Sequence, residues 1–246
     1  MNLIEFYNSY YRKSISAIPV PASRHDSKII GKMTEGFFFE VFQYLGSEII
    51  RRKNKNGYFV IDELNREIIR QLFYYFTYDS KYIGDLDKGI ALVGPYGTGK
   101  TLLLKTYTSL VNRLGNWRDV LMSDFYFISA IELYYSILNE GGIRNDLKTS
   151  AVEKYDYAHL RYKLFQSPII FDDIGKEPKE ALIFGTSIEP LADILRIRYE
   201  NNAITFLTSN VSLNTLGDHY GADLKDRFKE MFSEILLPGQ SRRFEQ

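Results

Sequence analysis

The sequence predicts an α/β fold: a five-stranded parallel sheet flanked by helices, preceded by a small helical N-terminal region. Two observations lead to this prediction. From Lys88 onward, short apolar segments alternate with amphipathic segments of helical period, which is typical of a parallel sheet covered on both faces. Before that point, residues 1–85 carry only helical patterns and turn signals. We therefore expect a helical N-terminal region over residues 1–85 and the main domain over residues 86–246.

Composition limits the kind of protein. With 45% apolar residues among 246, the chain can bury a sizeable core. Lys+Arg and Asp+Glu number 31 each, so the net charge gives no argument for nucleic acid or a membrane surface. The sequence has no cysteine, which excludes disulfides, thiol nucleophiles and thiolate zinc sites. Because it also lacks a signal-peptide pattern and any apolar run of about 18 residues, we expect a cytoplasmic protein without a membrane partner.

The N-terminal region is expected to hold helices. An aromatic helix candidate at its start is followed by "AIPVPASRHD", where Pro19 and Pro21 indicate a linker. A helix is predicted from Thr34 to about Lys53, because apolar residues recur there at helical spacing. Asp62 has the position of an N-cap for a further helix through about Tyr78. The intervening "RRKNKNG" is a basic turn, better explained as a solvated loop than as a phosphate-binding patch.

The main domain is expected to alternate strands and helices. Its strands are predicted at Ile90–Val93, Phe125–Ile128, Ile169–Phe171, Ile204–Leu207 and Glu234–Leu237. Its helices are predicted at Gly99–Leu114, Ala130–Asn139, Ala151–Phe165, Ile188–Glu200 and Leu224–Phe232. The second of these helices opens on "SAIE", which has the form of a capping box. The glycine-bearing "NEGGIRNDLKTS" is typical of a mobile surface loop.

A glycine-rich segment follows the first strand of the main domain. "GPYGTGKT" matches G-x-x-x-x-G-K-[ST] between the strand "GIALV" and the helical "LLLKTYTSLV", the context that this motif requires. Its glycines let successive backbone N–H groups turn inward around phosphates at a helix N-terminus. We expect Lys100 to reach the β- and γ-phosphates of ATP and the Thr101 hydroxyl to ligate Mg²⁺. The predicted nucleotide-binding residues here are Gly94, Pro95, Tyr96, Gly97, Thr98, Gly99, Lys100, Thr101 and Leu102.

Two carboxylates follow the third predicted strand, in "PIIFDDIGKE". A P-loop ATPase needs a carboxylate at a neighbouring strand end to hold Mg²⁺, directly or through water, and Asp172 has that place. Hydrolysis also needs a group that orients or deprotonates the attacking water, and Asp173 stands where many such enzymes have glutamate. Aspartate reaches about 1.5 Å less far, so either the water sits closer or turnover is slow. The alternative for both residues is a turn in which their side chains bond the backbone.

Further candidates lie nearer the C-terminus. The strand "AITFL" ends in "TSN", which places Asn210 on the ligand side of a parallel sheet, where it could position the same water. Taken alone, Asn210 is better explained as a helix N-cap. "YGADLKDRFKEMF" and "LPGQSRRF" add Arg227, Arg242 and Arg243. Guanidinium groups suit phosphate oxygens, although each of these arginines alone is more typical of a protein surface.

The order of these motifs resembles a known family. "GPYGTGKT", "IIFDDIG", "RYENNAITFLTSN", "YGADLKDRF" and "GQSRR" follow one another as in the AAA+ ATPases of the DnaC/DnaI helicase-loader group and the related IstB transposition ATPases. The resemblance covers roughly Lys88 to Phe244. It implies a P-loop NTPase fold in which the sensor-1 strand lies between the Walker A and Walker B strands. Asn210 would then lie beside Asp173.

The resemblance also implies residue roles. Walker A would comprise Gly94, Gly97, Gly99, Lys100 and Thr101, Walker B would comprise Asp172 and Asp173, and Asn210 and Arg243 would be sensors 1 and 2. Family members often carry two arginines four apart in the segment around Arg227, the first read as a finger inserted into a neighbour's nucleotide. Here the first position is Asp223, so either Arg227 serves as the catalytic finger or the contact is remodelled. Because the chain ends just after sensor 2, we expect no full C-terminal lid domain.

Three functional hypotheses follow. The leading one is a DNA-replication ATPase that forms a homo-oligomer on binding ATP, assembles on single-stranded DNA and loads or remodels a replicative helicase, with residues 1 to about 85 docking the partner. The second is an IstB-like regulator of a transposase. The third is a nucleotide-gated switch that hardly hydrolyses ATP, which the aspartates at 173 and 223 motivate. A small-molecule kinase would leave "FDDIG" and "TSN" without a joint explanation.

Four basic loop residues are candidates for contacts with DNA phosphates. Basic loop residues are able to touch phosphates but are better explained as solvated; they are Arg144, Lys148, Lys176 and Lys179.

Overall fold

A computed structural model describes residues 33–113, 125–139, 164–165, 167–183 and 185–242. Its centre is a five-stranded sheet in the order β2-β3-β6-β1-β7, and every neighbouring pair is parallel. The strands are β1 (Gly89–Val93), β2 (Tyr126–Ser129), β3 (Ile169–Ile174), β6 (Thr205–Ser209) and β7 (Phe232–Leu236). The predicted α/β fold and its five strands are confirmed. Strand β6 lies between β1 and β3, as the family resemblance implied.

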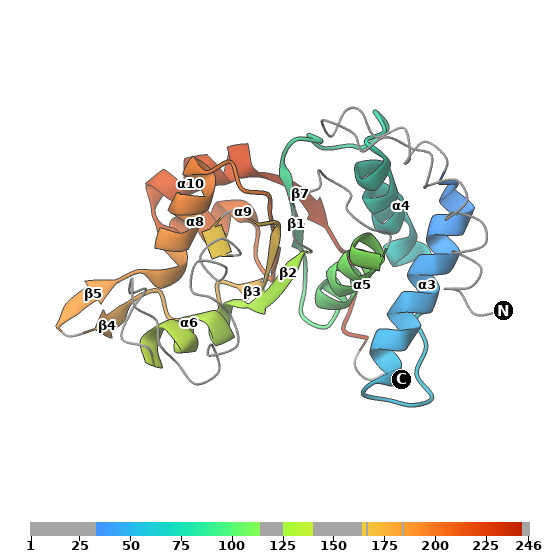
Figure 1. The fold of residues 1–246 in the computed structure, drawn as a ribbon, viewed down its shortest axis with the longest axis horizontal. Coiled ribbons are helices and arrows are strands. Elements are labelled where there is room, and N and C mark those ends of the chain that lie inside the picture. The colour runs from blue at the N-terminus through green and yellow to red at the C-terminus, as the bar shows by residue number, and fades with distance from the viewer. Residues whose placement is uncertain (1–32, 114–124, 140–163, 166, 184, 243–246) are drawn as a thin grey trace.

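Helices cover both faces of the sheet (Figure 1). One face carries α3 (Glu35–Arg51), α4 (Glu63–Thr77) and α5 (Lys100–Arg113); the other carries α6 (Ala130–Asn139), α8 (Pro190–Glu200), α9 (Leu213–Tyr220) and α10 (Ala222–Met231). Strand β1 is buried along its whole length because its side chains alternate between the two layers. Ile90 and Leu92 pack in the first apolar cluster, whereas Ala91 packs in the second.

The two N-terminal helices are part of the first layer. Thr34 caps α3, and Asp62 caps α4 in a reciprocal box with Asn65, as its position predicted. Phe38 of α3 meets the rings of Phe73 and Phe76 of α4, at centroid distances of 5.3 and 5.9 Å. These rings are core residues, packed in the same cluster as α5 and β1. Any partner of this region must therefore contact other side chains.

Several elements differ from the sequence prediction. Strands β4 (Ala181–Ile183) and β5 (Thr186–Ile188) form an antiparallel hairpin that projects from the body, and this hairpin was missed. The predicted start of α8 was therefore wrong, because Ile188 belongs to β5 and the helix opens at Pro190, which suits a first helical turn. Helix α9 was missed as well. Phe232, predicted as helical, is the extended first residue of β7.

Other predicted elements fall wholly or partly outside the described residues. These are the first N-terminal helix, the loop "NEGGIRNDLKTS" apart from Asn139, and the helix 151–165 apart from its last two residues. Among the residues that the structure does describe, no helix is long and apolar enough to span a membrane.

One buried cation fixes the N-terminal ends of two central strands. Arg198 of α8 has no exposed surface, and its guanidinium donates to the Thr205 hydroxyl and to the carbonyls of Leu164, Ser167 and Ile204. Burial lowers the pKa of Arg198 to about 9, so the group stays charged at neutral pH. Because these acceptors precede or begin β3 and β6, Arg198 holds the two strand entries together.

Candidate functional site

The glycine-rich loop runs from the end of β1 into the N-terminus of α5. Gly94 and Gly97 have φ angles of 151° and 76°, which other residues rarely adopt. A Cβ at Gly94 would lie 2.1 Å from the Leu237 carbonyl oxygen, and one at Gly97 would lie 2.2 Å from the Ser241 hydroxyl oxygen. The chain after β7 therefore packs directly against the back of the loop. A Cβ at Gly99 would meet nothing within 4 Å, which leaves space beside the start of α5.

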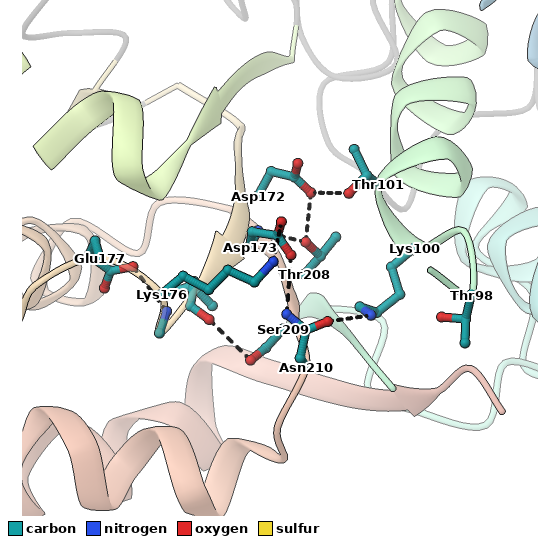
Figure 2. A network of polar contacts seen from close by, with 12 residues as sticks. Thr98, Lys100, Thr101, Asp172, Asp173, Lys176, Glu177, Thr208, Ser209 and Asn210 are labelled. Atoms are coloured by element: carbon teal, nitrogen blue, oxygen red, sulfur yellow. Dashed lines mark hydrogen bonds and ion pairs between the residues drawn. The ribbon is translucent and has the colours of Figure 1, made fainter. Parts of the chain in front are cut away.

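Lys100 turns its ammonium group back into this loop. The side chain is buried, and Nζ donates to the carbonyls of Gly94 and Pro95, both at 2.7 Å. It also donates to Oδ1 of Asn210 at 2.9 Å (Figure 2). Asn210 directly follows β6, and β6 lies beside β1 in the sheet. The sheet order therefore brings together two residues that are 110 positions apart in the chain.

Asp172 is buried in the second half of β3. Its Oδ1 accepts hydrogen bonds from the hydroxyls of Thr101 and Thr208, each at 2.7 Å. A carboxylate and a hydroxyl at this spacing suit a hard cation such as Mg²⁺. Among the described residues no cluster of three or more His, Cys, Asp or Glu side chains could hold a metal by itself. Mg²⁺ held by Thr101 and Asp172 would therefore need further oxygens from a nucleotide or water.

Asp173 owes its direction to an irregularity in β3. The pairing of β3 with β6 shifts register between Phe171 and Ile174, and Asp173 has a φ of 58°. Its backbone N–H donates to the Thr208 hydroxyl at 2.8 Å instead of to a strand carbonyl. Successive residues of a regular strand face opposite sides, so this bulge lets both aspartates join one site. Aspartate enters the left-handed region more readily than most residues, which gives a backbone reason for aspartate here instead of glutamate.

The Asp173 carboxylate has two partners. Oδ1 accepts from Nδ2 of Asn210 at 3.3 Å, as the family resemblance implied, and Oδ2 forms an ion pair with Nζ of Lys176 at 2.7 Å. The same ammonium lies 4.8 Å from the ring centroid of Tyr96 in the glycine-rich loop. Sequence reasoning missed Thr208 and treated Lys176 only as a DNA-contact candidate. The polar segment "TSN" was a sequence signal for Thr208, whereas no local pattern indicated that Lys176 would contact Asp173.

A buried carboxyl group, that of Glu177, stabilises the turn after β3. Glu177 is almost wholly buried; it accepts from the Gly175 N–H at 3.0 Å and from the Tyr220 hydroxyl. Burial raises the pKa of Glu177, although these hydrogen bonds oppose the shift. Leu216 of α9 packs so close to Gly175 that a Cβ there would lie 2.7 Å from its side chain. Helix α9 therefore supports the turn that carries Lys176.

Arg227, the candidate catalytic finger, has its contacts on helix α8. Arg227 lies over the ring of Tyr199 at 4.8 Å and 3.8 Å from a Glu200 carboxylate oxygen. Asp223, in the place of the family's first arginine, pairs with Arg196 at 2.8 Å, and this hydrogen bond lowers the pKa of Asp223.

Two more predicted residues, Arg242 and Leu102, have contacts elsewhere in the described structure. Arg242 forms two hydrogen bonds with the carboxylate of Asp62, and Arg243 lies outside the described residues. The Leu102 side chain packs against the first apolar cluster, so its backbone alone is left for a nucleotide.

Comparisons with known proteins agree with this geometry at the level of the fold. The crystal structure of the DnaC helicase loader matches 76% of this chain and 97% of its own, with 18% identity and a TM-score of 0.51. The crystal structure of DnaI matches 80% of this chain and 93% of its own, with 23% identity and a TM-score of 0.50. No protein-family model and no curated protein sequence matches the chain. The predicted resemblance to the DnaC/DnaI group is thus confirmed as a shared fold.

Proposed function

We propose that this chain, which has the fold of the DnaC and DnaI proteins, binds and hydrolyses ATP in DNA replication as a helicase loader acting with single-stranded DNA. One observation carries the nucleotide part of the proposal. Lys100 and Thr101 of α5, Asp172 and Asp173 of β3, and Asn210 after β6 form one set of hydrogen bonds at the carboxyl ends of the central strands, joined through the Thr208 hydroxyl. Ligands of open α/β sheets bind at that edge.

Each residue of the set has a role that fits its contacts. The backbone N–H groups of the glycine-rich loop would hold the β- and γ-phosphates together with Lys100. Thr101 and Asp172 would hold Mg²⁺, which supplies charge neutralisation on the phosphates. Asp173 would accept a proton from water as the water oxygen bonds the γ-phosphorus and the bond to the β–γ bridging oxygen breaks, which leaves ADP and phosphate. Asn210 would orient the carboxylate of Asp173 and the ammonium group of Lys100.

The partner part of the proposal rests on the fold and is tested separately. ATPase turnover of the purified full chain should rise when single-stranded DNA is added, and a replicative helicase should copurify with it in the presence of ATP. Nucleotide binding without either result would contradict the loader role. Preference for double-stranded DNA with ATP-dependent filaments would instead favour the transposition-regulator alternative.

A second candidate is a slow, nucleotide-gated switch. It is favoured by Asp223, which stands at the position of the family's first arginine. Its carboxylate forms an ion pair with Arg196. Arg227 is then the finger candidate left in this segment. Single-turnover hydrolysis at increasing protein concentration separates the two candidates. A rate that rises with concentration indicates a working contact from a neighbouring protomer, whereas a slow, constant rate favours the switch.

A further inference from the structure

We propose that Lys176 is a latch on Asp173: its ammonium group holds the carboxylate away from catalysis and releases it when phosphates enter the glycine-rich loop. The inference rests on the proposed ATPase function and adds a residue to it. The ion pair joins Nζ of Lys176 and Oδ2 of Asp173 at 2.7 Å, and Figure 2 shows the lysine side chain extended toward the aspartate. With Oδ1 bonded to Asn210, both oxygens of Asp173 are engaged.

The latch reaches across the site to the phosphate-binding loop. The Lys176 ammonium lies 4.8 Å from the ring centroid of Tyr96, a largely exposed residue of that loop. A cation at this position is next to the place where a triphosphate would bring several negative charges. Phosphate oxygens and the Asp173 carboxylate would therefore compete for one ammonium group, and binding of the substrate would free the carboxylate.

The exposure of the pair makes the latch weak enough to open. The two side chains are 34% and 35% exposed, and such ion pairs contribute little because water screens them. The turn that carries Lys176, in contrast, is firmly placed, since Gly175 is bonded to the buried Glu177 carboxylate and packed against Leu216. A fixed backbone with a releasable side chain is what a reversible restraint requires.

The chain offers a matched control. Lys179 lies three residues further on, has similar exposure, and pairs with Glu189 at 3.3 Å instead of with a site residue. Lys176→Met removes the charge and keeps most of the side-chain length, and Lys179→Met does the same outside the site. Lys176→Arg restores a cation that is able to reach Asp173.

The test is single-turnover hydrolysis of Mg·ATP by the full chain, with affinity for a fluorescent ATP analogue measured in parallel. Lys176→Met should raise the hydrolysis rate constant about two- to five-fold, the modest gain expected for release of an exposed ion pair, while the affinity stays within roughly two-fold. Lys179→Met and Lys176→Arg should behave like the wild type. The gain should vanish when Lys176→Met is combined with Asp173→Asn, because it acts through that carboxylate.

The outcomes separate the latch from the function on which it rests. If the wild type hydrolyses ATP and Lys176→Met leaves the rate unchanged, the latch is refuted while the ATPase stands. A lower rate also refutes it and makes Lys176 a contributor to turnover. If every variant binds ATP and none hydrolyses it, both the latch and the hydrolytic part of the proposed function fail. If none binds ATP, the nucleotide site itself fails, and the latch fails with it.

Discussion

Asp172 and Asp173 are neighbours in the chain but differ in surroundings. Asp172 is buried and accepts from two threonine hydroxyls, an environment of fixed oxygens that suits a cation ligand. Asp173 is about one-third exposed and faces an amide and an ammonium group. This difference supports the proposed roles, Mg²⁺ binding for the first and proton transfer for the second, as the sequence alone suggested for the pair.

The backbone at residue 173 limits which side chain fits there. Its φ of 58° lies in the left-handed region, where aspartate and asparagine are tolerated better than glutamate. Asp173→Glu should therefore lower the free energy of unfolding by about 1 kcal/mol, whereas Asp173→Asn should leave it nearly unchanged. Urea unfolding of the three proteins measures this. Equal stability of the two variants would show that the backbone does not select the residue.

The turn between β3 and the hairpin connects the proposed catalytic residues with α9. It begins at the bulge of Asp173, passes Lys176 and is anchored by Glu177 to Tyr220 at the end of α9. Helix α10 follows α9 directly and carries Arg227. The buried Glu177 carboxyl group thus connects the turn after the two aspartates with the helices that lead to Arg227.

The ionisation of Glu177 should make this anchor sensitive to pH. Burial raises the pKa of Glu177 above its ordinary value of 4.5, so the folded state favours the protonated form. Its contribution to stability is complete below about pH 4.5 and is lost as the pH rises through the folded-state pKa. The free energy of unfolding of the wild type, relative to Glu177→Gln, should therefore fall as the pH rises from about 4.5 toward neutrality.

Urea unfolding at several pH values measures this difference. The substitution removes one acceptor, so it also adds a constant offset that does not depend on pH. Parallel curves for the two proteins would show that the carboxyl group does not titrate differently on folding.

In the molecule as a whole, the C-terminal segment contacts both the glycine-rich loop and the N-terminal helix α4. The chain after β7 packs against Gly94 and Gly97, and Arg242 in that segment reaches Asp62, the cap of α4. The C-terminal segment is thus joined to the glycine-rich loop by packing and to α4 by the Arg242–Asp62 ion pair. Burial alone would raise the pKa of Asp62, but Arg242 and the backbone N–H groups of Leu64 and Asn65 lower it overall.

Breaking the Arg242–Asp62 ion pair should destabilise the fold. Arg242→Met should lower the free energy of unfolding at neutral pH by about 0.5 to 1 kcal/mol, a value kept small because both side chains are partly exposed. Since the pKa of Asp62 is lowered in the folded state, the loss should be complete above the ordinary value of 3.8 and should shrink as the pH falls below it. Urea unfolding at neutral and at acid pH tests this, with Lys229→Met as a control at an exposed pair. An equal loss of unfolding free energy in both variants would show that the Arg242–Asp62 pair stabilises the fold no more than an exposed surface pair.

Much of this architecture could be predicted from the sequence because it depends on local patterns. Alternating apolar segments identified the five strands, and the motif at 94–101 required a strand before it and a helix after it. The bulge at Asp173 and the partners of Lys176 were not readable, because they depend on one backbone angle and on the packing of distant segments. The hairpin was missed because its three-residue strands are shorter than the windows in which alternation is visible. Helix α9 did have a signal, the Ser212 cap.

The most direct test of the account is phosphate release from Mg·ATP by the wild type and by Asp173→Asn at matched nucleotide occupancy. We expect the wild type to release phosphate only when Mg²⁺ is present. Asp173→Asn should bind ATP with similar affinity and release phosphate at least about 100-fold more slowly, because it lacks the proton acceptor. Asp172→Ala should instead lose the Mg²⁺-dependent part of ATP binding. Equal loss of binding in both variants, or undiminished phosphate release by Asp173→Asn, would contradict the division of roles between the two aspartates.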